Sequence, residues 1–348
     1  MVLNLSQMPK PLILRTYDQL SSGYNELYKK TKICLSEDFF VIEDPLFKNN
    51  SSLSKEYWNA PELWICTIPD GEYLSFKNDK RDKKNYSILT MWESTKLPSW
   101  QIKQLEGFNK VIVPSKWNKE CFISGGYRNV DIVNLFVDEK VYFGRPKTRK
   151  LDKFVFSTGG LHLLTTGNDK RKDISSIIGA FKKEFQNDKD VELHIRLSEN
   201  DYYKQRRLID DQIKFFKMLP KEEDYAEFIA DTDAFISPAK SEGWGFMQIQ
   251  SIAVGRPVIS PNYSSLAEFL NKDNCFSVGY DEILASGNWG LAGGLWANVK
   301  LNSLRKQMRL AFDKKDELRA NWQKCSNSVI NGFSIKEYKS RLLNSLNI

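Results

Sequence analysis

Residues 241–250, SEGWGFMQIQ, combine a carboxylate, two glycines and a run with helical character. Gly243 and Gly245 allow backbone N–H groups to approach a ligand closely, because glycine has no side chain in the way. A helix that begins near Phe246 directs its free N–H groups and the positive end of its dipole to the same place. The stretch therefore predicts an anion site of the kind that binds a diphosphate.

Two polar side chains of this stretch stand where they can contact the rest of such a ligand. A carboxylate beside a phosphate is electrostatically unfavourable, so we expect Glu242 to accept hydrogen bonds from neutral hydroxyl groups, such as those of a sugar. Gln250 lies one helical turn beyond Phe246, about 6 Å along the axis, and can reach another polar part of the ligand. The alternative is a glycine-rich turn between a strand and a helix that binds nothing.

A second loop supplies positive charge. Residues 168–173, NDKRKD, place Arg171 and Lys172 just before a helix whose N-cap is expected at Asp173. Basic side chains at a strand-to-helix junction can neutralise a diphosphate leaving group. On its own, such a basic triplet is more often a solvated helix start. Together with the Glu242 loop in the same predicted sheet, it favours a shared pocket.

Short apolar segments alternate with amphipathic helices and must position these loops. Strands separated by helices predict parallel pairing and an α/β layer structure. The expected strands are residues 11–15, 62–68, 86–92, 110–115, 130–134, 153–160, 191–198, 213–219, 234–239 and 257–261. The pattern lapses between 139 and 153 into charge, Gly144 and Pro146. We therefore expect two domains, residues 1–146 and 147–332, followed by a helical tail.

Composition limits the class of protein. A chain of 348 residues is comfortable for two domains, and its net charge of +7 favours an anionic ligand or a polyanionic partner. The sequence contains no run of eighteen apolar residues, so no transmembrane helix is expected. The N-terminal residues lack the features of a secretory signal. The five scattered cysteines are typical of reduced thiols, so a cytoplasmic location is expected.

Other candidate residues carry weaker signals. The acidic pairs in DTD (231–233) and DKD (188–190) precede their strands, opposite the predicted site, and are interpreted as loop residues. His194 alternates within a strand and is expected to be packed, whereas His162 follows the strand 153–160 and is a candidate ligand contact. No His/Cys cluster indicates zinc, and no G-x-S-x-G or P-loop motif favours a hydrolase or a kinase. We expect no metal and no separate cofactor.

The C-terminal half resembles the retaining glycosyltransferases of family 4, which have the GT-B fold. The stretches that carry this resemblance are, in order, STGG, DKRKDISSIIGAFKKEF, KMLPKEEDYAEFIADTDAFISPAKSEGWGF and QSIAVGRPVISPNYSSLAEFL. MWESTKLPSWQ, KVIVPSKWNKECFISGG and VNLFVDEKVYF in the first half are similar more loosely, and residues 34–82 are the least assignable. The resemblance implies two Rossmann-like domains that face each other across a cleft, with C-terminal helices (333–348) packing back on the N-terminal domain.

The resemblance also implies roles for individual residues. The implied catalytic residue is Glu242, which meets the hydroxyls of the transferred sugar. The residues implied at the donor diphosphate are Arg171, Lys172, Gly243, Gly245, Phe246 and, from the first loop of the N-terminal domain, Gly23. Those implied at the donor sugar or ribose are Trp244 and Gln250, and those implied at the base are Met218 and Leu219. Trp92, Glu93 and Ser94 resemble an acceptor-side element, although Trp92 can equally be a core residue.

The implied activity is sugar transfer from a nucleoside-diphosphate sugar to an acceptor hydroxyl, with retention of anomeric configuration and without a metal. The acceptor attacks the face from which the nucleoside diphosphate leaves, and the departing phosphate oxygen takes its proton. Such a reaction needs positioning and charge neutralisation more than a general base.

One position departs from the family pattern of two glutamates separated by seven residues. Gln250 occupies the second position; its amide keeps an acceptor oxygen for the ribose but lacks the charge. The departure motivates an alternative, a non-catalytic GT-B relative that binds a sugar nucleotide or a partner. A GT-B epimerase or phosphorylase is a third reading. The donor sugar, the oligomeric state and the acceptor (glycan, lipid, protein or modified nucleic acid) stay open.

Overall fold

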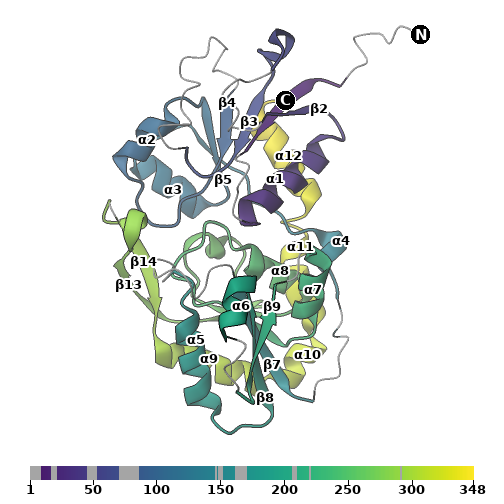
Figure 1. Ribbon diagram of the computed structural model, residues 1–348, viewed down its shortest axis with the longest axis vertical. Helices are drawn as coiled ribbons and strands as arrows, with labels where there is room; N and C mark the ends of the chain where they lie inside the picture. Colours follow the sequence, from purple (N-terminus) through teal and green to yellow (C-terminus); the bar gives the residue numbers. More distant parts are fainter. Residues whose placement is uncertain are drawn as a thin grey trace, which may run out of the picture. The chain divides into compact units, whose positions relative to one another are not determined.

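The computed structural model describes residues 9–16, 22–44, 53–69, 86–145, 147, 152–160, 171–205, 210–218, 221–290 and 292–348. The chain forms two compact units: unit 1 comprises Met1–Leu135 and Ile335–Ile348, and unit 2 comprises Phe136–Ser334. Each unit is built on a six-stranded sheet (Figure 1). All the strand pairs recorded in these two sheets are parallel, which confirms the predicted α/β fold.

Unit 1 alternates short strands with helices. Its strands are β1 (Pro11–Arg15), β2 (Phe40–Glu43), β3 (Glu62–Ile65), β4 (Tyr86–Leu89), β5 (Lys110–Val113) and β6 (Val130–Ile132). Its helices are α1 (Ser22–Leu35), α2 (Ser99–Leu105), α3 (Lys116–Ser124) and α12 (Ile335–Leu346), with a 3-10 turn at Lys55–Tyr57. The strand order is β2-β1-β3-β4-β5-β6. Strands β3 and β4 are buried along their whole length, as expected for the middle of a parallel sheet.

The last helix returns to unit 1, where α12 packs against α1 (Figure 1). The Tyr338 hydroxyl lies 2.7 Å from the Thr31 hydroxyl in a buried contact. Lys339 pairs with Glu37 and Asp38, in each case at 2.7 Å. This arrangement confirms the expected packing of the C-terminal helix on the N-terminal domain.

Unit 2 repeats the same architecture and includes two longer strands of seven residues each. Its sheet strands are β7 (Phe154–Gly160), β8 (Val191–Leu197), β9 (Ile213–Lys217), β10 (Ala234–Ile236), β11 (Val258–Ser260) and β12 (Cys275–Ser277). Its helices are α4 (Glu139–Tyr142), α5 (Ile174–Phe185), α6 (Glu199–Gln205), α7 (Glu222–Ala230), α8 (Phe246–Val254), α9 (Leu301–Asp313), α10 (Lys315–Ala320) and α11 (Trp322–Ile330). The strand order is β12-β11-β10-β7-β8-β9, so β10 lies next to β7.

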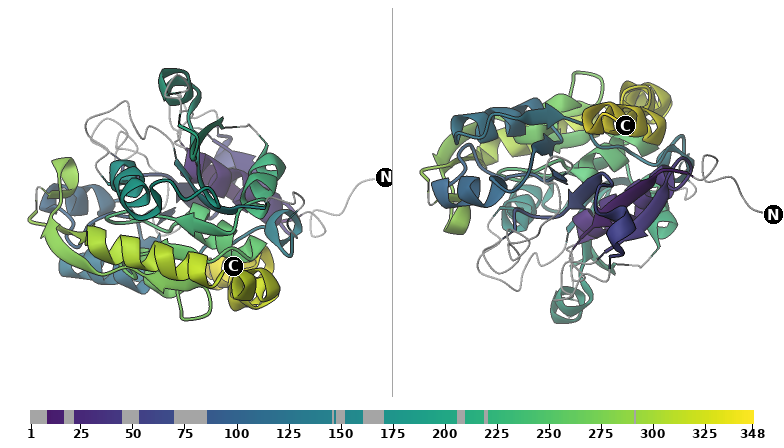
Figure 2. Two further views of the ribbon diagram at one scale, coloured as in Figure 1. Left: turned by 90° about the horizontal axis from the view of Figure 1, so that it is seen from below. Right: turned by 90° about the horizontal axis from the view of Figure 1, so that it is seen from above.

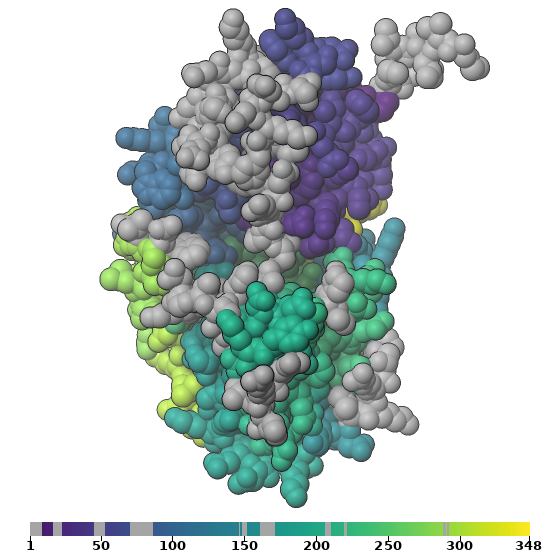
Figure 3. All heavy atoms as spheres, in the orientation of Figure 1, coloured from purple at the N-terminus to yellow at the C-terminus, as the bar shows by residue number. Residues whose placement is uncertain are grey.

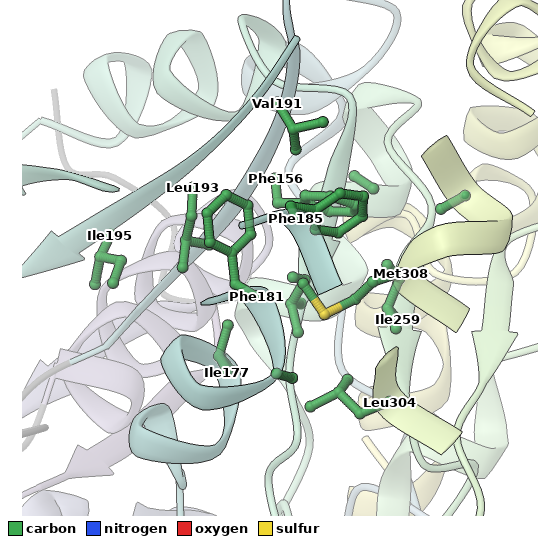
Figure 4. Packing of buried hydrophobic residues seen from close by; sticks show 14 of the residues in the cluster. Phe156, Ile177, Phe181, Phe185, Val191, Leu193, Ile195, Ile259, Leu304 and Met308 are labelled. Atoms are coloured by element: carbon green, nitrogen blue, oxygen red, sulfur yellow. The ribbon is translucent and has the colours of Figure 1, made fainter. Parts of the chain in front are cut away.

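Phenylalanine rings fill the core of unit 2 between the sheet and helices α5 and α9 (Figure 4). Phe156 of β7 and Phe185 of α5 have ring centroids 5.6 Å apart, and Phe181 lies 5.5 Å from Phe185. Such tilted and edge contacts each add about 0.5–1.5 kcal/mol to the gain from burial. The left view of Figure 2 shows α9 along its length. This packing anchors α5, whose first turn follows Arg171 and Lys172.

Several elements differ from the expectation. Strand β2, helix α6 and an antiparallel hairpin of β13 (Tyr280–Leu284) and β14 (Leu295–Val299) were not foreseen. The hairpin, light green in Figure 3, lies at the surface, where Leu284 is 69% exposed. The division between the units falls at Leu135/Phe136, before the expected connection at 139–153, because α4 packs against α7 and α8 of unit 2.

Candidate functional site

The loop of residues 237–245 joins the carboxyl end of β10 to the first turn of α8. Glu242 in this loop is only 5% exposed, and its backbone N–H donates to the Ser264 hydroxyl at 3.0 Å. Gly245 caps α8 with a φ of 100°. The predicted strand–loop–helix unit is therefore present, with the carboxylate held inside it.

Glycine is required at position 245 for two reasons. Its φ lies in the region that side-chain-bearing residues rarely adopt. A Cβ added there would also lie 2.3 Å from Leu266 Cδ2. The tight start of α8 therefore depends on this one residue.

We expect Gly245→Ala to destabilise the protein by about 2–4 kcal/mol, from the unfavourable φ and the overpacking against Leu266. Urea unfolding measures the effect. The matched control is Gly179→Ala in α5, where an added Cβ meets nothing within 4 Å. This control should be neutral or up to about 1 kcal/mol more stable, because alanine favours a helix. Equal stability of the two variants would contradict the strained cap.

The two predicted strand-end loops meet at the Glu242 carboxylate. Lys172 Nζ lies 2.5 Å from Glu242 Oε1, and Arg171 Nη1 lies 3.2 Å from Oε2. Arg171 Nη1 also donates to the Ser241 carbonyl at 2.7 Å, and the Arg171 carbonyl accepts from the Lys240 N–H at 2.8 Å. Since β7 and β10 are neighbours, the described residues 171–173 before α5 and the loop of residues 237–245 after β10 are brought together. The single carboxylate thus pairs with both cations that are expected to bind a diphosphate.

The electrostatics of this cluster fix Glu242 in its charged form. Burial by itself would raise the pKa of Glu242. The charges of Lys172 and Arg171, together with hydrogen bonds from Lys172 and Gln248, lower that pKa instead, from its ordinary 4.5 to about 2. The group is therefore a carboxylate at any pH near neutrality and can only accept hydrogen bonds.

Gln248 is a member of the site that the sequence analysis missed. It is 2% exposed, and its Nε2 donates to Glu242 Oε1 at 3.2 Å and to the Ser237 hydroxyl at 2.8 Å. Gln250 is half-buried and lies about 200° around α8 from Gln248, on a different side of the helix. The signal available in the sequence was a second glutamine in an otherwise apolar stretch of α8.

A small cavity of about 10 Å³ lies at this cluster, room for roughly one water molecule. Its lining includes Lys172, Glu242 and Gln248, with Thr158 and Gly159 from the end of β7. The carboxyl ends of adjacent parallel strands thus converge on one polar point, the usual place for a ligand in such a sheet.

Other predicted donor contacts fall in different surroundings. Trp244 is 1% exposed and packs against Phe269 and Phe333, with ring centroids 5.4 Å and 5.6 Å away. Its side chain therefore lies in the core of unit 2, and its predicted contact with the donor sugar or ribose stays a prediction. The Met218 N–H donates to the Leu197 carbonyl just after β9. Leu219 and His162 lie outside the described residues.

The predicted acceptor-side residues form a turn after β4 in unit 1. Trp92 is 7% exposed, and its indole N–H donates to the Ser94 hydroxyl at 3.0 Å and to the Lys96 carbonyl at 2.7 Å. Ser94 is fully buried, whereas Glu93 is half-exposed. The Trp92 side chain therefore fits the interpretation as a core residue better than that as an acceptor contact. Gly23 lies in the first turn of α1, and its predicted contact with the diphosphate stays a prediction.

Among the described residues, no group of three or more His, Cys, Asp or Glu side chains is placed to hold a metal ion. As expected, His194 is packed: it contacts Glu192 at 2.9 Å and the Phe216 ring at 4.8 Å. The described helices include none long and apolar enough to cross a membrane.

The residues of this site lie in a segment of the chain that matches a known protein family by sequence. Residues 152–286 match the model of the family described as glycosyl transferases group 1. This match includes β7, the Arg171–Lys172 loop, β10 and the Glu242 loop. No curated protein matches the chain by sequence.

Solved structures resemble 82–97% of this chain at low sequence identity. A glycosyltransferase from Rickettsia africae is 14% identical, with a TM-score of 0.68 over 97% of this chain and 98% of that one. Anabaena HepE, solved with UDP and glucose, is 12% identical, with a TM-score of 0.64 over 97% and 99%. An S. aureus TarM variant, solved with fondaparinux, alpha-GlcNAc-glycerol and UDP, is 15% identical, with a TM-score of 0.61. That match covers 82% of this chain but only 55% of TarM. The chain thus has the GT-B fold of glycosyltransferases, and its residues 152–286 match the group 1 model.

Proposed function

We propose that the protein is a glycosyltransferase of the family 4 type, which transfers a hexose from a nucleoside-diphosphate sugar to an acceptor hydroxyl with retention of configuration. The cluster of Glu242, Arg171 and Lys172 carries this proposal. Two consecutive cations after β7 suit a diphosphate, and the carboxylate that follows the adjacent strand β10 suits the hydroxyls of the attached sugar. The UDP found with TarM and HepE, and the UDP-glucose found with HepE in another structure, support a nucleotide-sugar donor.

The proposed chemistry begins with an exchange of ionic partners. The diphosphate binds Arg171 and Lys172 in place of Glu242, and the released carboxylate accepts from the sugar hydroxyls. The bond between the anomeric carbon and the phosphate oxygen breaks, and both cations stabilise the charge that develops on that oxygen. The acceptor oxygen bonds to the same face of the sugar, and its proton passes to the departing phosphate. No metal takes part in this proposal.

A panel of UDP-, GDP-, ADP- and dTDP-sugars tests the proposal. We expect at least one donor to release its nucleoside diphosphate at a rate unchanged by EDTA. NMR of the transferred sugar should show the anomeric configuration of the donor. A protein that neither binds nor hydrolyses any member of the panel would refute the proposal. The cytoplasmic location expected from cysteine usage stays a prediction.

Gln250 motivates the second candidate, a protein that binds a sugar nucleotide or a partner without catalysis. For an active enzyme, we expect Gln250→Glu to tighten donor binding about fivefold with kcat within about twofold, because a charged acceptor gains roughly 1 kcal/mol over a neutral one. Calorimetry and initial rates measure the two quantities. Gln323→Glu, at an exposed position of α11, is the control. An inactive protein that gains turnover with Gln250→Glu favours the second candidate.

A further inference from the structure

A second cavity lies at the opposite edge of the unit 2 sheet, apart from the Glu242 cluster. It has a volume of about 250 Å³ and is lined by Lys147, Asp233, Gly255, Arg256, Leu318, Arg319 and Trp322. Asp233 directly precedes β10, and Gly255 and Arg256 come just before β11. The Glu242 loop follows the other end of β10, so the two sites are separated by that strand.

Positive charge exceeds negative charge in the lining of this cavity. Its cations are Lys147, Arg256 and Arg319, and its carboxylate is Asp233, which the sequence analysis interpreted as a loop residue. Asp233 is 4% exposed and binds Arg319 Nε at 2.8 Å and Lys147 Nζ at 2.9 Å. Counting these lining residues, three positive charges face one negative charge.

The Asp233 carboxylate already accepts four hydrogen bonds. Its Oδ1 accepts from Arg319 Nε at 2.8 Å. Its Oδ2 accepts from Lys147 Nζ at 2.9 Å, from the Val155 N–H at 2.8 Å and, more weakly, from Arg319 Nη2 at 3.4 Å. None of these four hydrogen bonds involves Arg256.

Arg256 retains donor capacity although it is 94% buried. Its Nη2 donates to the Ala230 carbonyl at 2.6 Å. Its Nη1 donates weakly, at 3.4 Å, to the carbonyl of Gly255, the preceding residue. Its Nε has no acceptor among the described residues, and the side chain lines the cavity. A buried guanidinium with unfilled donors is costly, and an anion with several oxygens relieves this cost.

The pKa directions agree with this excess of positive charge. Burial lowers the pKa of Lys147, and the nearby charges of Arg319 and Arg256 lower it further against the pull of Asp233. Burial also lowers the pKa of Arg256, which Asp233 and, more weakly, Asp231 oppose. An anion bound in the cavity would favour the charged form of both side chains.

We propose that this cavity binds a small phosphate dianion, either inorganic phosphate or a phosphate monoester, through Lys147, Arg256 and Arg319. Arginine guanidinium groups bind phosphate with paired hydrogen bonds. Trp322 and Leu318 form an apolar wall on which the organic part of a monoester can rest. The volume lies below the usual range for ligand pockets, so it suits a small monoester and not a nucleotide sugar.

Calorimetric titration tests the proposal at constant ionic strength. Saturating UDP is present in both cell and syringe, so that the Glu242 cluster does not compete for the probe. The probes are inorganic phosphate and glucose 6-phosphate. We expect one binding site, and tighter binding of the monoester would assign the apolar wall to its organic part. Equal affinities would assign the site to inorganic phosphate. No binding of either probe, or binding without a defined stoichiometry, overturns the proposal.

Arg319→Gln locates the bound anion. We expect its Kd for phosphate to rise at least about tenfold, since one charged partner is lost. Arg305→Gln is a matched control and should leave this Kd unchanged. Each of the two arginines pairs with one carboxylate, and the side chain is 35% exposed in Arg319 and 34% exposed in Arg305. Lys172→Gln should leave this Kd unchanged, whatever it does to donor binding. If Arg319→Gln fails to fold, Lys147→Gln carries the same expectation. Unchanged binding in the folded cavity variant, or loss of binding in Lys172→Gln, contradicts the assignment.

Discussion

Glu242→Gln is expected to bind UDP about tenfold more tightly than the unchanged protein and to transfer sugar at least about a hundredfold more slowly. The two effects have opposite directions because Glu242 has two partners in the proposed cycle. Before the donor binds, its carboxylate occupies Lys172 at 2.5 Å and Arg171 at 3.2 Å. A neutral amide releases both cations to the diphosphate.

The loss of turnover has a separate cause. In the proposed complex, the Glu242 carboxylate accepts from sugar hydroxyls, and such hydrogen bonds weaken when the acceptor loses its charge. The sugar is then less well positioned as the anomeric bond breaks. Gln248 Nε2, which donates to Glu242 Oε1 at 3.2 Å, can still donate to the amide oxygen, so we expect the fold to persist.

Calorimetry with UDP and initial rates with the best donor of the panel measure the two effects. Glu227→Gln is the control, since that side chain is 65% exposed on α7 and should change neither quantity. Weaker UDP binding in Glu242→Gln would show that the carboxylate does not compete for the cations. Unchanged turnover would remove Glu242 from the reaction.

The grouping of Arg171, Lys172 and Glu242 could be predicted because it depends only on topology. Both loops follow parallel strands, and the carboxyl ends of such strands share one edge of the sheet. The pairing of β7 with β10 supplies the adjacency. The sequence did not reveal that Glu242 pairs with both cations, because such ion pairs depend on side-chain geometry.

The contacts that the sequence did not reveal share a different cause. Trp244 lies between two glycines and was expected to face a ligand, but its neighbours Phe269 and Phe333 come from distant parts of the chain. Gln248 was missed because the rotation of α8 about its axis decides which glutamine faces Glu242. Asp233 is a loop residue just before β10, as predicted, but its ion pair with Arg319, 86 residues away, was not foreseen. Local patterns contain no information on such long-range contacts.

Replacing both cations, as Arg171→Gln with Lys172→Gln, is expected to reverse the pH dependence of stability that Glu242 contributes. In the unchanged protein, the pKa of Glu242 is about 2, below its ordinary 4.5. The charged group therefore stabilises the fold above pH 4.5, and this contribution is lost as the pH falls towards 2. It is worth about 3 kcal/mol, the difference of pKa converted to free energy.

In the double variant, burial becomes the dominant influence on Glu242, and its pKa rises above the ordinary value. A carboxyl pKa that is raised by folding reverses the pH dependence of stability. The charged form is then penalised in the fold at neutral pH, and the penalty is relieved as the pH falls through the raised pKa. We expect the variant to be about 3 kcal/mol less stable at pH 7, near the lower end for a broken buried ion pair, because Lys172 is 23% exposed.

Urea unfolding between pH 4 and 8 measures how the free energy of unfolding depends on pH in the unchanged protein and in the double variant. Relative to the unchanged protein, the double variant should regain stability as the pH falls. Lys182→Gln, which removes an exposed partner of Asp210, controls for the loss of a surface charge and should follow the unchanged protein. Adding Glu242→Gln to the double variant should restore most of the lost stability at pH 7, because no buried charge is then left unpaired. A double variant whose stability falls with pH as in the unchanged protein would mean that solvent, not Arg171 and Lys172, keeps Glu242 charged.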